Sequence, residues 1–195
     1  MRVRSTIAAL LFLAPAVLAA QHGPGVPPVR AAPAEARQFD FLLGQWELAV
    51  KPQARTLAGR IHGVPEMLGT WKAWRALDGW GITDELRITD ASGNPRVLSY
   101  SVRMYDAVTR RWTTSAADVY RNAFSSATGE LRDGRMTTRS SGTDPDGKAY
   151  LTRSRYAGIT PTMFRYEQER SVDDGKTWTR TLVIEARRVA AVAPR

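Results

Sequence analysis

Short stretches rich in Thr, Val, Tyr, Trp and Arg alternate with clusters of turn-forming residues along most of this chain, from Leu43 onward. Several stretches place apolar and polar residues at alternate positions, which is the pattern of a strand with one buried face. We find no long helical period. The rhythm predicts successive β-hairpins, with strands at 43–50, 68–77, 80–89, 97–105, 111–119, 129–140, 149–157, 162–170 and 177–189. The region 55–66 is a candidate for one more strand.

The turns between these strands carry residues suited to tight hairpins. Ranges 90–95, 144–147 and 173–175 combine Gly with Asp or Asn, so Gly can adopt a positive φ while the polar side chain accepts hydrogen bonds from the turn. Sequential hairpins make a meander, and an open sheet of about nine or ten strands would expose two edges. Closing the sheet on itself removes them. We therefore expect an all-β fold, a single antiparallel meander closed into a barrel.

Period-two alternation also predicts which side chains face the interior. In range 97–105 the odd positions carry Ser and Arg, so we expect the even set to point inward: Leu98, Tyr100, Val102 and Met104. In the last strand the more apolar set is also the even one, and we expect it to point inward: Trp178, Arg180, Leu182, Ile184, Ala186 and Arg188.

Residues 1–20 have the parts of a signal peptide. Arg2 and Arg4 precede an apolar run over 7–13, and small residues follow up to Ala20. The run is far shorter than the ~20 residues that cross a bilayer, and no stop-transfer segment follows it, which disfavours a retained anchor. We expect cleavage after this segment and a mature protein that is periplasmic or secreted, without stable membrane insertion.

The rest of the chain divides by composition. Residues 21–37 are rich in Pro, Ala and Gly and are predicted to form a flexible leader. Residues 34–43 mix helix formers with apolar side chains, which predicts a short helical turn that plugs one barrel end. The barrel is expected over 38–189, with a tail at 190–195.

Charge and cysteine content limit the function classes. The chain has no Cys, so the barrel must be stable without disulfides. The formal charge is +9, and it falls to +7 when Arg2 and Arg4 leave with the signal. The arginines are spread along the chain rather than gathered in a stripe, which favours a solvated Arg-rich surface over nucleic-acid binding.

The start of the first predicted strand carries a motif. Phe39-Asp40-Phe41-Leu42-Leu43-Gly44-Gln45-Trp46 contains Gly-x-Trp after a leader and before a run of hairpins. It resembles the first-strand signature of lipocalins and the wider calycin group. The resemblance implies that Trp46 closes one barrel end and that an Arg near the end of the last strand packs across its indole. Arg188 is the matching candidate and Arg187 the second choice. Such a pair contributes roughly 1–2 kcal/mol when partly desolvated.

The mature chain as a whole, over about 38–189, resembles a bacterial family of exported proteins that begin with Phe-Asp-x-x-x-Gly-x-Trp and are usually described only as domains of unknown function. The resemblance implies a lipocalin-like or fatty-acid-binding-protein-like barrel and no catalytic residues. The later lipocalin motifs are not recognisable here.

A second motif matches the Asp-box pattern Ser-x-Asp-x-Gly-x-Thr-Trp found on hairpins of sialidases and other glycan-acting proteins. It comprises Ser171, Asp173, Gly175 and Trp178. In those families the box is a structural element that is normally repeated, whereas this chain has one copy. A structural turn is therefore favoured over a glycosidase.

Residues for catalysis are scarce. The histidines are His22 and His62, so we expect no metal site and no cofactor. A near match to a phosphate-binding loop at 142–149 ends in Ala149 and opens a strand rather than a helix, which excludes it. Asp84 is the candidate acid, because it shares phase with Ile82 and Ile88 and is expected to face inward. The alternative is that an inward Arg, such as Arg165 or Arg180, pairs with it.

Aromatic residues are plentiful in the predicted strands. They either fill the barrel or line a cavity together with arginines, and the candidate binding residues are Tyr100, Trp112, Tyr150, Tyr156, Arg165 and Arg180. The favoured function is binding of a small apolar or amphipathic molecule. The alternatives are an isomerase-like or hydrolase-like enzyme that uses Asp84, and a structural or protein-interaction module of the cell envelope.

Overall fold

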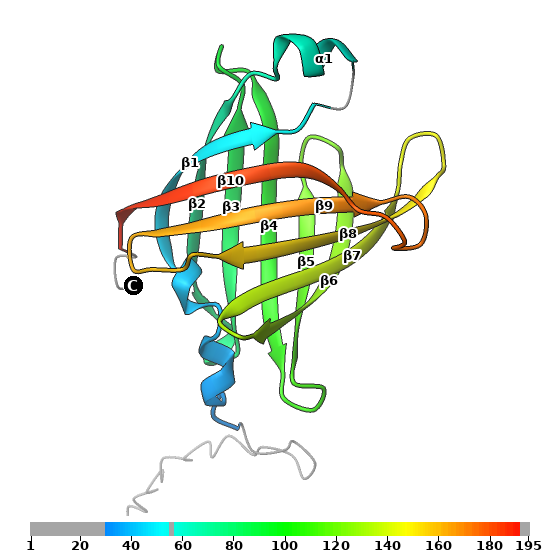
Figure 1. Ribbon diagram of the computed structural model, residues 1–195. Coiled ribbons are helices and arrows are strands. Elements are labelled where there is room, and N and C mark those ends of the chain that lie inside the picture. Colours follow the sequence, from blue (N-terminus) through cyan, green and yellow to red (C-terminus); the bar gives the residue numbers. More distant parts are fainter. Residues whose placement is uncertain (1–29, 55–56, 192–195) are drawn as a thin grey trace, which may run out of the picture. The chain divides into compact units, whose positions relative to one another are not determined.

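The computed structural model describes residues 30–54 and 57–191. From Ala31 onward the chain forms one compact unit, a closed barrel of ten antiparallel strands in meander order (Figure 1). The first strand pairs with both the second and the last, which closes the sheet. The strands are β1 (Gly44–Pro52), β2 (Met67–Ala76), β3 (Gly81–Thr89), β4 (Pro95–Asp106), β5 (Arg111–Asp118), β6 (Ala123–Arg132), β7 (Arg135–Thr143), β8 (Ala149–Ala157), β9 (Met163–Ser171) and β10 (Thr179–Ala190).

The expected all-β meander barrel of lipocalin-like or fatty-acid-binding-protein-like type is thus confirmed. Strands β2–β5 run close to upright in Figure 1, and β8–β10 cross them on the near side. In the described part of the chain no helix is long and apolar enough to span a membrane. The predicted signal peptide and most of the predicted leader lie outside the described residues.

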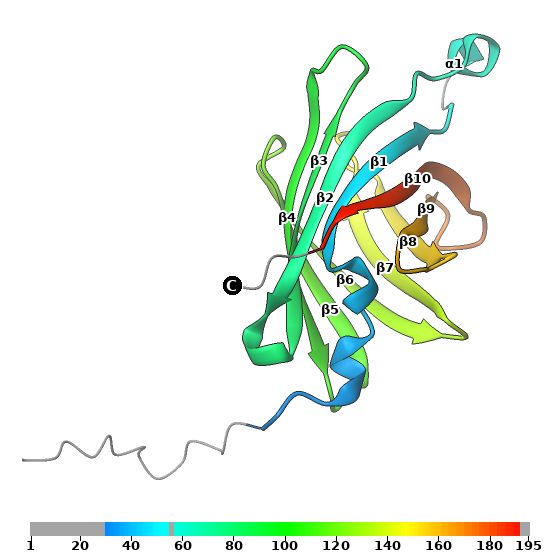
Figure 2. The ribbon, with the colours of Figure 1, turned by 90° about the vertical axis from the view of Figure 1, so that its left-hand side faces the viewer.

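Two strand predictions were wrong. The range 129–140 is not one strand, because Asp133 and Gly134 both adopt positive φ and form the tight turn between β6 and β7. This Asp-Gly pair is a strong hairpin signal that the alternation of the flanking residues hid. The region 55–66 adds no strand; it contains the short helix α1 (Leu57–His62) in the connection from β1 to β2 (Figure 2).

One end of the barrel is closed by the segment that precedes β1. The expected helical turn consists of two 3₁₀ turns, η1 (Ala34–Arg37) and η2 (Asp40–Leu42). Ala36, Leu42 and Phe39, which directly precedes η2, are fully buried. The Phe39 ring meets the edge of Trp112 at 4.8 Å between centroids. A third 3₁₀ turn, η3 (Leu77–Gly79), connects β2 and β3. We call this end the closed end and the opposite end the open end.

A layer of large aromatic side chains fills the closed end. Its members contact one another edge to face or tilted, with ring centroids 4.7–6.0 Å apart, and such pairs add about 0.5–1.5 kcal/mol each beyond burial. They are Phe39, Trp46, Trp71, Trp112, Tyr156 and Phe164, all nearly inaccessible to solvent. The closed end is therefore solid core.

The predicted inward set of β4 was wrong. Ser101, Arg103 and Tyr105 are buried, whereas Tyr100 and Met104 are 41% and 49% exposed on the outer face. The hydrophobic count misled because the one charged residue of the odd set, Arg103, has an ion-pair partner inside the barrel. Outside, the Tyr100 ring packs against Trp74 from β2 instead.

The inward set of β10 is correct only in part. Ile184 and Ala186 are buried in the interior. A register shift between Arg180 and Leu182 turns Arg180 to the outer face. Such a bulge changes the phase of a strand without a clear mark in its apolar pattern.

Candidate functional site

A buried ion pair lies in the interior against the aromatic layer, where Arg103 lies over the rings of Phe39 and Trp71. Asp84 on β3 is 1% exposed, and the side chain of Arg103 on β4 is 8% exposed. Arg103 donates from Nε to Asp84 Oδ2 at 2.6 Å and from Nη2 to Oδ1 at 3.2 Å, and Trp71 Nε1 donates to Oδ1 at 2.8 Å. Burial opposes the charged form of Arg103, but Asp84, together with Tyr156 and Tyr166, more than offsets this effect, so the pKa of Arg103 is raised. Asp84 faces inward, and its partner is Arg103 rather than Arg165 or Arg180.

A row of hydrogen-bonded side chains follows on β8 and β9. Burial raises the pKa of Tyr156, so its hydroxyl stays protonated. The Tyr156 ring lies 5.0 Å from the ring of Tyr166. The Tyr166 hydroxyl is 2.8 Å from Ser154 Oγ and accepts a hydrogen bond from Gln168 Nε2 at 3.2 Å. This row is the boundary of the aromatic core on the side of the open end.

Beyond this row the interior has two unlike walls. The wall from β1 and β3 is apolar and consists of Leu48, Val50, Leu86 and Ile88. The wall from β4–β8 carries small and hydroxyl side chains, which are Ser101, Thr114, Ala127, Thr138, Ser140 and Thr152. An apolar wall that faces a hydroxyl wall suits a molecule with one apolar and one polar side.

Solvent reaches this part of the interior. Leu86, Ala127, Thr138 and Tyr166 point inward and are still only half-buried. In the part of the chain that the structure describes, one buried side-chain oxygen lacks a hydrogen-bond partner, Thr83 Oγ1, and it lies on the outward phase of β3. The unpartnered hydroxyls of the inner wall are therefore not sealed from water. The open end is accessible, whereas the closed end is not.

An arginine and a tyrosine stack at the open end. The guanidinium carbon of Arg170 on β9 lies 3.8 Å from the ring centroid of Tyr150 on β8. Both residues share the inward phase of their strands with Tyr156 and Phe164. The Tyr150 ring covers the backbone of its cross-strand partner Gly142, where a Cβ would lie 2.6 Å from Tyr150 Cζ. Tyr150 was predicted as a binding residue from the sequence, and Arg170 was missed.

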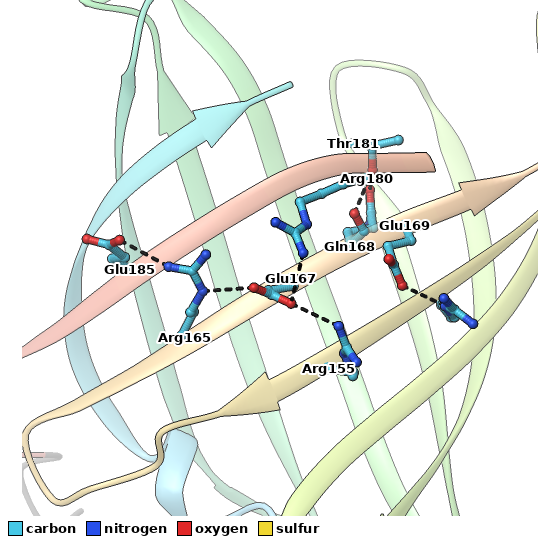
Figure 3. A network of polar contacts seen from close by, with 9 residues as sticks. Arg155, Arg165, Glu167, Gln168, Glu169, Arg180, Thr181 and Glu185 are labelled. Atoms are coloured by element: carbon cyan, nitrogen blue, oxygen red, sulfur yellow. Dashed lines mark hydrogen bonds and ion pairs between the residues drawn. The ribbon is translucent and has the colours of Figure 1, made fainter. Parts of the chain in front are cut away.

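The two arginines predicted to line the interior lie outside it. Arg165 donates to Glu167 at 2.9 Å and to Glu185 at 3.3 Å, and Arg180 lies 3.8 Å from Glu167 on the outer face (Figure 3). Hydrogen bonds and charge from these arginines and Arg155, with Arg165 the largest contributor, lower the pKa of Glu167. The prediction that Arg165 and Arg180 line the interior was therefore wrong. Arg165 is at an odd position of β9, which faces outward, and Arg180 pairs in register with Glu169 at another such position. The prediction that Tyr100 is a binding residue of the interior was also wrong, because its side chain lies on the outer face.

The other predicted binding residues belong to the closed end. Trp112 is fully buried and donates from Nε1 to Gln38 Oε1 at 3.1 Å. Tyr156 is 2% exposed beneath Tyr166. Both therefore pack in the core layer and not on the accessible walls.

Trp46 and Arg188 meet at the closed end. The guanidinium carbon of Arg188 lies 4.1 Å from the Trp46 ring centroid. Its N–H groups donate to the carbonyls of Pro161 at 2.5 Å, Phe41 at 3.1 Å and Leu43. Trp46 Nε1 donates to the Leu42 carbonyl at 2.7 Å. Gly44 has a φ of +117°, and a side chain there would overlap the Arg188 guanidinium.

The Asp-box residues form a self-contained turn between β9 and β10. Asp173 accepts from Ser171 Oγ at 2.6 Å and from the backbone and hydroxyl of Thr177, and these bonds lower its pKa to about 2. Trp178 Nε1 donates to the Gly175 carbonyl at 3.0 Å, and Arg153 stacks on the indole at 4.3 Å. These polar groups of the turn form hydrogen bonds with one another.

The outer face also carries a shallow groove. It has a volume of about 600 Å³ and crosses β5–β8. The groove is lined by outward Thr and Ser residues, Arg139 and Leu151, and also by three residues of the inward phase, Thr114, Ala127 and Ser140. The groove does not include the ion pair, the tyrosines or the arginine stack of the interior.

Comparison with known proteins bears on the fold. Rv2717c from M. tuberculosis is similar with a TM-score of 0.52 and 15% identity, over 81% of this chain and 99% of that chain. The S-type phycobiliprotein lyase CPES from Guillardia theta is similar with a TM-score of 0.51 and 12% identity, over 81% and 97%. No protein family and no curated protein sequence matches the chain. At these identities the likeness establishes a shared barrel fold.

Proposed function

We propose that this protein binds a small amphipathic molecule inside the open half of its barrel. The observation that carries the proposal is the accessible, two-sided interior, in which an apolar wall faces a hydroxyl wall. A ligand would lie with its apolar side against the half-buried Leu86 and its polar side toward the half-buried Thr138 and Ser140. The aromatic layer at the closed end limits how deep it can enter.

The geometry of Asp84 favours binding over catalysis. A general acid or base must reach the atom whose proton it moves. Asp84 accepts three hydrogen bonds from Arg103 and Trp71 and is 1% exposed. Removing either partner would leave a charge unpaired in the interior, which is a structural role.

One observation supports the interaction-module alternative. Tyr100 and Met104 on β4 and Phe124 on β6 are exposed on the outer face, Phe124 by 85%. Tyr100 and Phe124 both pair in register with Ala117 of β5, so they lie on one surface. That alternative leaves the half-buried interior without a role, so we rank it second.

The compartment follows from the N-terminal pattern. We propose that the protein works in the periplasm or outside the cell, because residues 1–20 combine Arg2 and Arg4 with a short apolar run and small residues. Mass spectrometry of the intact protein from a bacterial periplasm would test this. A mass that includes residues 1–20 would contradict it.

The binding experiment compares two neighbouring positions on β6. Both residues border the outer groove, but Ala127 has the inward phase of the strand and Ser126 the outward phase. Titration with Nile red, a neutral dye that fluoresces in apolar surroundings, should give saturable binding to the wild type. Ala127→Phe fills the interior and should lower the affinity for the dye by about tenfold or more. Ser126→Phe should leave the affinity within about twofold of the wild-type value.

Other outcomes contradict the proposal. Absence of saturable dye binding by the folded wild type would remove the interior site. Weakening by Ser126→Phe with no effect of Ala127→Phe would place the dye in the outer groove. Native mass spectrometry of the periplasmic protein, followed by organic extraction, would then identify any ligand that co-purifies.

A further inference from the structure

The arginines that share an inward phase differ in what they bind. Arg75 pairs with Asp40 and donates to the Ala36 carbonyl at 3.0 Å. Arg103 pairs with Asp84, and Arg188 donates to backbone carbonyls. Arg170 is the exception, because among the described residues its contact is the Tyr150 ring, with no carboxylate within 4.0 Å and no acceptor for its N–H groups.

We propose that Arg170 binds the anionic group of the ligand, so that the barrel selects amphipathic carboxylates or sulfonates over neutral amphiphiles. This inference rests on the proposed function and names its ligand class. The site is the stack of Gly142, Tyr150 and Arg170 on three neighbouring strands at the open end.

The stack positions the guanidinium and leaves its N–H groups free. Contact at 3.8 Å with the Tyr150 centroid uses the face of the guanidinium. The five N–H donors lie in the plane of the group and point away from its face, where a carboxylate can accept two parallel hydrogen bonds. Gly142 makes room for the ring beneath, so the arginine is held in place before a ligand arrives.

Neighbouring side chains complete an anion site. Register pairs place Ser140 and Thr152 in one row with Arg170 across β7, β8 and β9. Both hydroxyls point inward and can donate to an anion. The carboxylates of β9, Glu167 and Glu169, face outward and pair with outer arginines (Figure 3).

Three acidic side chains near this end have other partners. Asp118 shares the inward phase of β5 and is paired with Arg121 from the next turn, and Asp144 and Asp173 accept hydrogen bonds within their own turns. Leu182 on β10 pairs in register with Gln168, two positions from Arg170 along β9, and joins the apolar wall of β1 and β3. An alkyl chain with its carboxylate at Arg170 can therefore extend inward along apolar side chains.

The test is competition against bound Nile red by three amphiphiles with the same chain: dodecanoate and dodecyltrimethylammonium below their micelle concentrations, and dodecanol below its solubility limit. For the wild type, dodecanoate should displace the dye at a roughly tenfold lower concentration than dodecanol. Arg170→Gln should abolish this preference and keep dye affinity. Arg170→Lys keeps the positive charge but loses the planar guanidinium that forms two parallel hydrogen bonds, so it should retain part of the preference for dodecanoate.

The matched control is Arg165→Gln on the outer face of the same strand, which should keep the full preference for dodecanoate. Equal displacement by dodecanoate and dodecanol in the wild type, or an unchanged preference in Arg170→Gln, would overturn the inference while dye binding upholds the proposed function. Absence of dye binding by the folded wild type would overturn the proposed function itself. Thermal melting of each variant shows that it is folded.

Discussion

Two arginines stack on aromatic rings at opposite ends of this barrel. Arg188 lies 4.1 Å from the centroid of Trp46, and Arg170 lies 3.8 Å from that of Tyr150. The contacts are alike, but the N–H groups of Arg188 are taken by carbonyls whereas those of Arg170 have no protein acceptor among the described residues. Because its edge is occupied, Arg188 acts as a clamp, whereas the free edge of Arg170 is the basis for the ligand-binding role that we propose for it.

The largest predicted difference concerns the rings. Trp46 is fully buried, so Trp46→Ala should lower the free energy of unfolding by about 3–5 kcal/mol. Tyr150 is half-buried at the open end, so Tyr150→Ala should cost about 1 kcal/mol or less. Urea unfolding followed by tryptophan fluorescence and circular dichroism measures both. Similar losses for the two variants would break the comparison.

An intermediate difference is expected for the arginines. Arg188→Met removes hydrogen bonds to three carbonyls near the barrel closure and should cost about 1–3 kcal/mol. Arg170→Met removes only a stack, so its unfolding free energy should stay within about 0.5 kcal/mol of the wild type. The same urea titration tests this. A larger loss for Arg170→Met than for Arg188→Met would mean that Arg170 holds the fold.

The smallest effect on stability is expected at Gly142. The Cβ of Gly142→Ala would meet the far end of the Tyr150 ring, which can swing away, so the loss should be well under about 1 kcal/mol. The displaced ring no longer supports Arg170, and the preference for dodecanoate should fall severalfold. In Arg170→Gln the same change should have no further effect on the preference. If Gly142→Ala and Arg170→Gln instead changed the preference for dodecanoate additively, Gly142 would not act through the stack.

The sequence predicts the barrel well because hairpin chemistry and alternation are local properties. The Gly-x-Trp motif likewise leads to Gly44, Trp46 and Arg188, which meet at the closed end. The missed strand boundary at Asp133 was also local, and the Asp-Gly pair there would have revealed it.

The interior is less predictable because it depends on pairing between strands. Arg103 faces inward although it is charged, because its ion-pair partner Asp84 lies on the neighbouring strand. The alternation of residues along one strand does not reveal such a partner. The bulge before Leu182 turns Arg180 outward. Arg170 gains its role from Tyr150, and that contact follows from the register of β8 on β9.

The closure of the sheet also affects how the chain reaches its native state. The Leu43 carbonyl and the Arg188 guanidinium, which bond to each other, are separated by 145 positions in the chain. Contacts between such distant segments form slowly because much of the chain must be ordered first. The closed sheet cannot be completed before the last strand has been synthesised. The barrel therefore closes after synthesis of β10, and until then β1 presents an unpaired edge that is prone to wrong association.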